Sequence, residues 1–178
     1  NVLEFEIAQI IRDKENLDLP KINGLNQSRS DLIGNIEFNP SEFFNLGYEF
    51  SVDNNLKTTN LHLLKTSFKA NNFVTSFEFL EENNNIGINS HLSNTTTFNF
   101  NENNNLTFKT SENLNKNITE YYNLIYEYKN DCLAAAIEYD KQYYSDESIK
   151  PEENILFSIK IIPFGNIKTP GLSKWVKN

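Results

Sequence analysis

Cys132 is the only cysteine in this 178-residue chain, so it cannot form a disulfide within it. It follows a polar turn at Asn130 and Asp131 and precedes an alternating run that begins at Leu133. In an oxidising compartment such a thiol can pair with a cysteine outside the chain. In a cytosolic protein it would most often be a small buried hydrophobic residue. The residues leave both interpretations open.

The other residues capable of acid–base or metal chemistry do not form a recognisable site. His62 and His91 lie on different predicted strands, with no cysteine or acidic residue at metal-ligand spacing. The carboxylate pairs Glu81–Glu82 and Glu152–Glu153 lie in or beside predicted loops, where adjacent acidic residues are usually solvated charge. No nucleophile elbow, P-loop or dinucleotide-binding fingerprint is present. We therefore expect no enzyme activity, no metal and no cofactor.

Charge and composition exclude several classes of protein. The net charge of -8 argues against a nucleic-acid partner, which normally requires a basic face. No apolar run approaches the 18 or so residues of a membrane helix. The 14 Phe and 8 Tyr argue against disorder despite the many asparagines. The absence of methionine, including at position 1, and a start within a strand pattern indicate a fragment of a longer protein.

Side chains alternate between apolar and polar along most of the chain. A period of two predicts a strand with two different faces. The alternation is clearest in residues 44–53 and 154–161, where we expect these side chains to share one face: Phe44, Leu46, Tyr48, Phe50, Ile155, Phe157, Ile159 and Ile161. Glu49 and Ser51 lie on the opposite face of the first run, and Asn154, Ser158 and Lys160 on that of the second, where Leu156 is the exception.

The whole pattern predicts about ten strands of about ten residues. Their expected ranges are residues 3–13, 31–39, 44–52, 56–68, 73–80, 86–100, 106–112, 118–128, 133–143 and 154–164, with a β-bulge near residues 60–64. A tilted membrane-spanning strand needs this length, whereas strands of soluble proteins are about half as long. The fold class expected is therefore all-β, an antiparallel meander forming part of a transmembrane outer-membrane barrel. The apolar rows named above would face lipid, and Glu49, Ser51, Ser158 and Lys160 would face the lumen.

Turn lengths and aromatic positions point the same way. The predicted loops after the first, fifth and ninth strands are long, and those after the second, fourth, sixth and eighth are tight. The loop after the third strand is short, which breaks the alternation on one side. Short periplasmic turns and long outer loops are typical of outer-membrane barrels, so Cys132 would lie on the periplasmic side. Phe and Tyr cluster near strand ends, as aromatic girdles do. We assign residues 1–165 to the barrel and residues 166–178 to a periplasmic tail.

Three stretches of this chain resemble the C-terminal barrel segment of the LPS-assembly outer-membrane protein family (LptD, organic solvent tolerance), in an alphaproteobacterial form. They are residues 30–53, with Phe38-x-Pro40 and Tyr48-x-Phe50; residues 130–139, Asn-Asp-Cys-Leu to Ile-Glu-Tyr; and residues 151–165, Pro-Glu-Glu-Asn-Ile-Leu-Phe to Ile-Ile-Pro-Phe-Gly. In order and spacing the resemblance covers most of the chain, although residues 56–117 match only as barrel strands.

The resemblance implies a function in the bacterial outer membrane. The family inserts lipopolysaccharide into the outer leaflet, and the partners implied are lipopolysaccharide, a plug lipoprotein, periplasmic LPS-bridge proteins and the barrel-assembly machinery. Its lateral gate lies beside the last strand, which here would include Asn154, Phe157, Ser158, Lys160 and Pro163. Its C-terminal cysteines pair with a periplasmic domain, and Cys132 lies at that position as a single residue rather than an adjacent pair.

Two other functions remain as alternatives. One is a small self-contained outer-membrane barrel with a structural or adhesive role, since barrels begin at about 8 strands. The other is a soluble β-sandwich that binds a ligand, which would have to cover the rows of apolar side chains. The length of the predicted strands favours either membrane barrel over the soluble β-sandwich.

Overall fold

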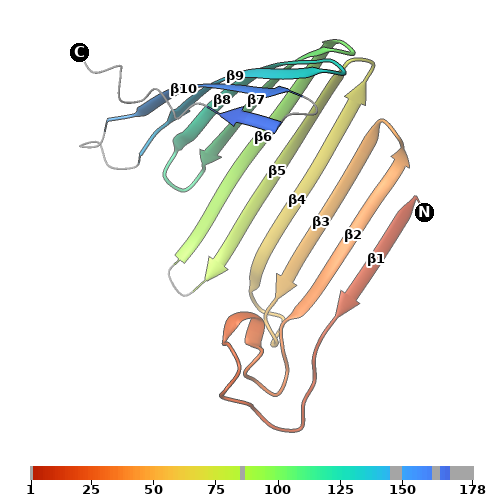
Figure 1. Cartoon of the computed structure of the whole chain (residues 1–178). Coiled ribbons are helices and arrows are strands. Elements are labelled where there is room, and N and C mark those ends of the chain that lie inside the picture. Colours follow the sequence, from red (N-terminus) through yellow and green to blue (C-terminus); the bar gives the residue numbers. More distant parts are fainter. Residues whose placement is uncertain (1, 85–86, 145–149, 162–164, 169–178) are drawn as a thin grey trace. The chain divides into compact units, whose positions relative to one another are not determined.

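The computed structural model describes residues 2–84, 87–144, 150–161 and 165–168, and these residues form an all-β meander. Eleven strands follow one another in sheet order β1 to β11 (Figure 1). Every strand pair with a defined register is antiparallel. The predicted all-β antiparallel meander is therefore confirmed. The strands are β1 (Leu3–Ala8), β2 (Leu32–Ser41), β3 (Phe44–Val52), β4 (Thr59–Ala70), β5 (Phe73–Asn84), β6 (Gly87–Asn101), β7 (Asn104–Asn113), β8 (Ile118–Lys129), β9 (Leu133–Gln142), β10 (Glu152–Ile161) and β11 (Gly165–Lys168).

The chain divides into two compact units, which we describe separately. The N-terminal unit comprises Asn1–Phe68 and Phe77–Leu92, and the C-terminal unit comprises Lys69–Ser76 and Ser93–Asn178. One short 3-10 helix, η1 (Ile22–Gly24), lies in the loop between β1 and β2. In the described part of the chain, no helix has the length and apolar character of a membrane span.

Several strand boundaries differ from the sequence-based prediction. β3 agrees with it, but β1 ends at Ala8 because the following backbone pairs within the β1–β2 loop, as in the bridge between Ile11 and Arg29. The predicted polar loop at residues 81–85 is wrong, since β5 continues to Asn84. A sheet with one polar face accepts such residues, and the Ser90 hydroxyl donates to the Glu81 carboxylate across it at 3.5 Å.

The predicted β-bulge in the fourth strand is confirmed. Ser51 pairs with Leu61 and Val52 with Thr59, so Asn60 is the extra residue. The side chain of this extra residue forms a hydrogen bond, in which the Asn60 amide donates to the buried Asp31 carboxylate at 2.8 Å. The slip in alternation therefore marks a position where the bulge redirects a polar side chain.

The end of the sheet also differs from the prediction. β11 pairs with Ser158–Ile161 of β10, so the strand that was predicted to be last is followed by another. Residues 166–168, assigned from the sequence to a periplasmic tail, belong to this strand. The four residues of β11 are too few to show an alternating pattern in the sequence. Their pairing with β10 is evident only from the structure. Pro163 lies outside the described residues.

Asparagine side chains close the tight turns of the C-terminal unit. In the β6–β7 turn the Asn101 carboxamide accepts from the Asn103 backbone N–H at 2.9 Å. Between β8 and β9, the Asn130 carboxamide accepts from the backbone N–H groups of Cys132 and Leu133, at 2.9 and 2.8 Å. Such local hydrogen bonds are why asparagine favours turns. They account for part of the asparagine content of this chain.

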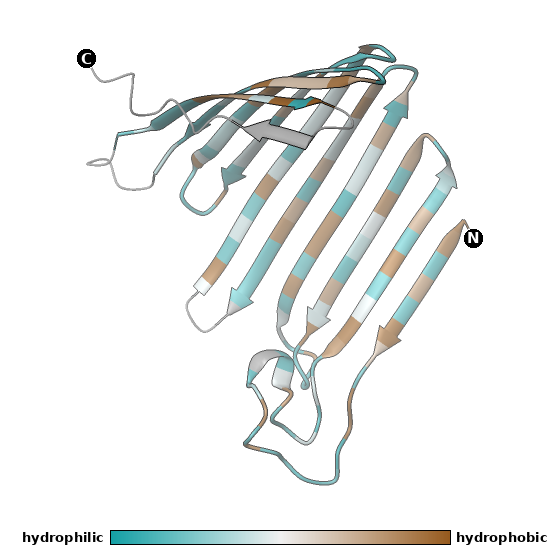
Figure 2. Ribbon diagram, viewed as in Figure 1, coloured by the Kyte–Doolittle hydropathy of each residue, from teal (hydrophilic) through white to brown (hydrophobic). Residues whose placement is uncertain are grey.

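Cross-strand register sorts the side chains into two faces of opposite polarity. Opposed residues in an antiparallel pair lie on the same face, and alternation is visible along the strands in Figure 2. We call one face apolar; in the N-terminal unit it carries Phe5, Ile36, Phe38, Leu46, Tyr48, Phe50 and Leu64, and in the C-terminal unit Phe108, Leu124, Tyr126, Ile137, Tyr139, Ile155, Phe157 and Ile159. We call the other face polar; it carries Glu37, Glu49, Ser51 and Lys65 in the first unit and Ser111, Asn123, Glu127, Glu138 and Lys160 in the second.

Burial is inverted relative to an ordinary soluble domain. Among the described residues no hydrophobic side chain is buried, whereas seven polar ones are: Ser30, Asp31, Ser51, Ser90, Ser111, Asn113 and Asn123. Large apolar side chains in mid-strand remain open, as shown by Ile137 at 48% exposed and Leu124 at 41%. A soluble fold gains most of its stability from the reverse arrangement. The apolar face therefore requires a cover that the described residues do not supply.

Gly34 shows how closely the apolar face is packed within the N-terminal unit. It pairs with Phe50, whose ring lies over the glycine, so that a Cβ at this position would overlap the ring. An aromatic ring that covers a glycine on a neighbouring strand is a known device for fixing register. Gly47, on β3, has no atom within 4 Å of the corresponding position.

We predict that Gly34→Ala destabilises the folded protein by about 1–3 kcal/mol, because the Phe50 ring must leave its place. Gly47→Ala is the matched control and should be neutral or slightly stabilising, since it only restricts the unfolded chain. Urea titration of the folded protein measures both. Equal effects of the two substitutions would contradict the packing described for Phe50.

Candidate functional site

The side chains predicted to face lipid do share the apolar face. In β3, Leu46, Tyr48 and Phe50 oppose Phe38, Ile36 and Gly34 of β2, respectively. Phe44 opposes Phe68 of β4, and their ring centroids are 4.9 Å apart. In β10, Ile155, Phe157, Ile159 and Ile161 oppose Tyr139, Ile137, Ala135 and Leu133 of β9. The predicted rows are thus continuous across strands in each unit.

Aromatic rings and charges gather at the loop end of the apolar face in the C-terminal unit. The rings of Phe108 and Tyr122 stack at 6.0 Å, and Tyr122 meets Tyr143 edge-on at 5.9 Å. Lys141 and Glu153, opposed across β9 and β10, form an ion pair at 2.6 Å, and the ammonium lies 5.4 Å from the Tyr143 ring centroid. The apolar row of each strand therefore ends in amphipathic and charged groups, as it does where a barrel strand meets lipid headgroups.

One tyrosine just beyond β9 donates a hydrogen bond to a carboxylate beside this cluster. The Tyr144 hydroxyl donates to the Glu152 carboxylate at 3.0 Å. This hydrogen bond, followed by partial burial, raises the pKa of Tyr144 above its ordinary value of 10.0. The phenol is protonated at neutral pH in any case, and the shift extends its range as a donor to more alkaline pH.

Aromatic side chains also mark the tight-turn end of the C-terminal unit. Phe98 and Phe100 meet edge-on at 4.9 Å. The Tyr126 hydroxyl donates to the Asn104 carboxamide at 2.7 Å, and the Asn130 amide donates to the Tyr128 hydroxyl at 2.9 Å. Each ring lies on the sheet while its hydroxyl reaches a polar turn, which is the behaviour of interfacial tyrosine. The predicted clustering of aromatics at strand ends is confirmed.

Two clusters of polar side chains interrupt the apolar face, and in each cluster the side chains form hydrogen bonds with one another. In the N-terminal unit the Tyr48 hydroxyl and His62 Nδ1 are 2.7 Å apart, with the rings stacked at 6.1 Å. In the C-terminal unit, Thr75, Asn94 and Thr96 form a cycle of hydrogen bonds of 2.8 to 3.1 Å. No group of three or more His, Cys, Asp or Glu residues in the described part of the chain could hold a metal.

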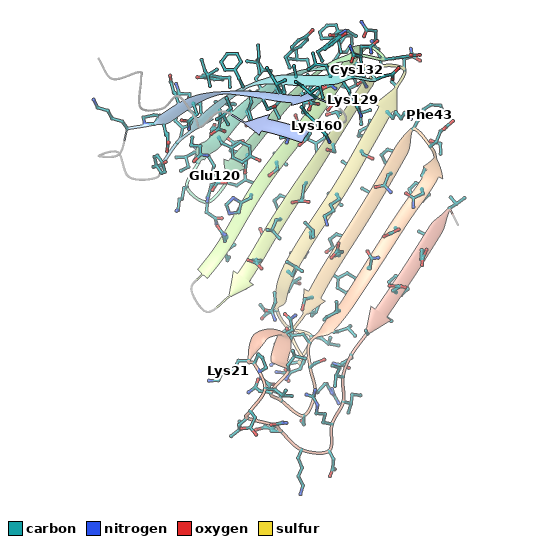
Figure 3. All side chains as sticks on the ribbon, in the orientation of Figure 1. Lys21, Phe43, Glu120, Lys129, Cys132 and Lys160 are labelled. Carbon is teal, nitrogen blue, oxygen red and sulfur yellow. The ribbon has the colours of Figure 1, made fainter. Side chains whose placement is uncertain are left out.

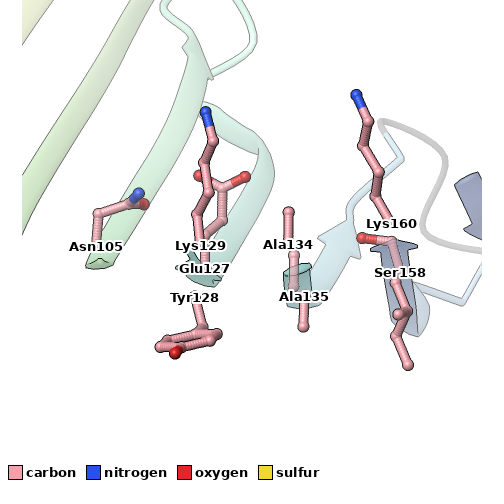
Figure 4. Close-up of a pocket in the computed structure, with 10 residues that line it drawn as sticks. Asn105, Glu127, Tyr128, Lys129, Ala134, Ala135, Ser158 and Lys160 are labelled. Carbon is pink, nitrogen blue, oxygen red and sulfur yellow. The ribbon is translucent and has the colours of Figure 1, made fainter. Parts of the chain in front are cut away.

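The polar face of the C-terminal unit contains a hollow of about 220 Å³. Ala134 and Ala136 of β9 form its floor, because their small side chains leave space between longer residues on β8 and β10. Lys129 and Lys160 oppose Ala134 from its two sides, and Glu127 and Ser158 oppose Ala136 in the same way. Figure 4 shows Lys129, Lys160, Ser158 and Asn105 on one side of the sheet, with Tyr128 and Ala135 on the other.

The groups around this hollow are not neutralised by their neighbours. Among the described residues neither Lys129 nor Lys160 forms an ion pair, whereas Lys65 pairs with Glu49 at 3.4 Å. Asn105 of β7, which opposes Glu127 of β8, has a fully buried side-chain oxygen without a hydrogen-bond partner. Asn123 has another such oxygen, but it does not line the hollow. An unsatisfied buried acceptor is costly and needs an explanation. The hollow can therefore receive both an anion and a hydrogen-bond donor.

Only part of this site is predicted by the sequence. Ser158 and Lys160 are expected there as gate-strand residues, whereas no pattern in the sequence singles out Lys129, Glu127 or Asn105. The sequence does contain one local signal for a hollow, which is the run of three small residues Ala134–Ala136. Lys129 precedes this run, and Lys160 lies on the next predicted strand. Only the register shows that both lysines meet the same alanine.

The gate-strand residues and Cys132 lie on the same unit as the hollow. Asn154, Ser158 and Lys160 project on the polar face of β10 and Phe157 on its apolar face. Cys132 is exposed and unpaired within the described chain, in the tight turn between β8 and β9 (Figure 3). Its backbone is fixed by Asn130, so the thiol is presented outside the sheet.

Comparison with known proteins does not add to this description. No protein-family model and no curated protein matches the chain.

We predict that the two faces respond differently to the same substitution at adjacent residues of β8. Leu124→Arg, opposite Phe108 and Tyr139, should destabilise the folded protein by about 2–4 kcal/mol, because it places a charge on the apolar face. Ile125→Arg should cost much less, because its neighbour across the sheet is Glu138 on the polar face. Denaturant titration of both variants measures the difference. Equal costs would contradict the assignment of faces.

Proposed function

We propose that this chain forms part of the wall of a transmembrane β-barrel in a bacterial outer membrane, and that the barrel inserts lipopolysaccharide into the outer leaflet. The apolar face meets lipid and the polar face lines the lumen. The observation that carries the location is the inverted burial. Polar side chains are buried and apolar ones are open among the described residues, and this is the arrangement that a lipid solvent favours.

Strand length supports the same location. Seven strands have ten to twelve residues and one has fifteen, whereas a tilted strand needs about 9–11 to cross the hydrocarbon layer. In the C-terminal unit, tight turns at Asn71–Asn72, Glu102–Asn103 and Asn130–Cys132 alternate with the longer connections at residues 114–117 and 143–151. Only two residues separate β5 from β6, so the long loop expected there is not present.

The lipopolysaccharide function rests on the family resemblance and on the polar face. A pathway for an amphipathic, anionic lipid needs a hydrophilic lumen beside an opening to the membrane. In our proposal β10 and β11 border that opening, because within the described residues β11 pairs with Ser158–Ile161 alone of the ten-residue β10. A seam with few backbone hydrogen bonds opens at a lower cost than a fully paired one. The plug lipoprotein, the periplasmic bridge and the assembly machinery would be partners of the full-length protein.

The choice of a larger barrel over a small self-contained one rests on the family resemblance. β1 and β11 are the terminal strands in the sheet order, and unpaired backbone groups are not tolerated in lipid. Each of these strands therefore needs a partner, and the resemblance assigns that partner to further strands of the full-length protein. A soluble sandwich would instead require a second layer over each apolar face.

Nitroxide labels at Leu124→Cys and Ile125→Cys, in a Cys132→Ser background, test the membrane location. In vesicles containing the full-length protein, we expect the label at 124 to collide mainly with oxygen dissolved in lipid. The label at 125 should collide mainly with a water-soluble nickel chelate. A label at 124 that is shielded from both reagents would indicate a protein core and would overturn the proposal.

Depletion of the protein in its source bacterium tests the transport function and should lower the amount of surface lipopolysaccharide. An unchanged amount would overturn the transport function and leave the proposed membrane location standing.

We further predict, from the resemblance and from the exposed position of Cys132, that the full-length protein forms a disulfide between this residue and an upstream cysteine. The oxidising periplasm permits such a bond. Non-reducing electrophoresis of the wild type and Cys132→Ser should show different mobilities that become equal after reduction. Identical mobility before reduction would eliminate the disulfide.

A further inference from the structure

We propose that the hollow formed by Ala134 and Ala136 is a binding site for an anionic sugar, a saccharide unit that carries a phosphate or carboxylate. Lys129 and Lys160 bind the anion, and Asn105, Glu127 and Ser158 bind the sugar hydroxyls. The inference rests on the proposed function only in taking the polar face to be accessible from the barrel lumen. It adds a defined place on the wall and a ligand chemistry for that place.

The two lysines are arranged to meet one anion. They oppose the same alanine from neighbouring strands, and adjacent strands are spaced by roughly 4.8 Å, so the two backbone positions are about 10 Å apart. Figure 4 shows both side chains extending from the same side of the sheet. A lysyl side chain is long and flexible enough for both ammonium groups to reach a group held above Ala134.

Ordinary structural roles do not account for both lysines. Lysine on an exposed strand discourages aggregation, which is a sufficient reason for Lys160 near the end of the strand order. β8 lies between β7 and β9, so this reason does not apply to Lys129. Both lysines also lack a carboxylate partner among the described residues, although the net charge of the chain is -8. Two adjacent unpaired cations in an acidic chain favour an external anion.

The remaining groups show that the ligand is more than a bare anion. The buried oxygen of Asn105 has no donor, and the Glu127 carboxylate can only accept hydrogen bonds. A phosphate or carboxylate is itself mainly an acceptor and would leave these groups unsatisfied. Sugar hydroxyls supply the missing donors, and the Ser158 hydroxyl can donate or accept in the same site. An anion attached to a polyol satisfies all of these groups together.

The volume limits the size of the ligand. Sites for drug-sized molecules enclose about 300–1,000 Å³, and this hollow measures about 220 Å³. It therefore accommodates one sugar unit with its charged substituent and not a whole glycolipid. The unit can come from a lipid headgroup or from a free sugar phosphate, and the experiment must separate these sources.

Protection of lysines from an amine-reactive reagent tests the proposal on the wild-type full-length protein in vesicles. We expect glucose 6-phosphate to protect Lys129 and Lys160, measured by mass spectrometry, while Lys109 on the same face remains reactive. Inorganic phosphate should protect them at least about tenfold less effectively and glucose not at all, because each supplies only half of the contacts. Equal protection by phosphate and glucose 6-phosphate would overturn the sugar site, and no protection would overturn the anion site.

Matched variants confirm the position of the site. Lys129→Gln with Lys160→Gln should weaken glucose 6-phosphate binding at least about tenfold, whereas Lys109→Gln should not. Ala134→Leu should fill the hollow and abolish binding. Ile137→Leu, on the apolar face and outside the hollow, should leave binding unchanged. Loss of binding in the Ile137 variant as well would place the ligand elsewhere.

The same lysine-protection experiment with lipopolysaccharide in mixed micelles separates the two sources of the ligand. Protection of the same lysines by lipopolysaccharide supports a lipid headgroup as the source. Protection by glucose 6-phosphate alone supports the anionic-sugar site while counting against the proposed transport function. Normal nitroxide profiles and surface lipopolysaccharide with no protection by either ligand would support the function and overturn the site.

Discussion

Cross-strand register is the constraint on which the rest of this molecule depends. Because side chains alternate along a strand, a shift of one residue in any pair would exchange the two faces completely. The register is held by features that tolerate little slippage: the Phe50 ring over Gly34, the extra residue at Asn60 and the asparagine-capped turns. Each is local, yet together they determine which side chains lie on the apolar face and which lie on the polar face.

The resulting distribution of polarity inverts the usual logic of the hydrophobic effect. A soluble sheet buries its apolar side chains and exposes polar ones. Here buried serine, asparagine and aspartate satisfy one another by hydrogen bonds, as in the contacts of Asp31 with Ser51 and Asn60. Such networks are most stable when all of their members are paired. The side-chain oxygens of Asn105 and Asn123 are the two exceptions among the described residues, and Asn105 is the one that lines the hollow.

The C-terminal unit combines the features on which both proposals depend. β10 contributes apolar side chains to one face and Ser158 and Lys160 to the other, and β11 pairs with only part of it. A cavity for a sugar and a weakly paired seam would then lie within the same few strands. The alanines of β9 serve both faces: Ala134 and Ala136 leave the hollow open, and Ala135 keeps the apolar row between Tyr128 and Ile159 shallow.

The sequence by itself determined the class of structure, because period-two alternation follows directly from strand geometry and needs no tertiary information. β3 and the bulge near Asn60 were readable from that pattern alone, as were the face assignments of Leu46, Ile159, Ser158 and Lys160. Strand ends were not, since Ala8 and Asn84 end strands for reasons of backbone pairing rather than side-chain type. Only the tertiary structure brought Lys129, Lys160 and Asn105 to one hollow, because register across four strands is set by many weak contacts that no single segment contains.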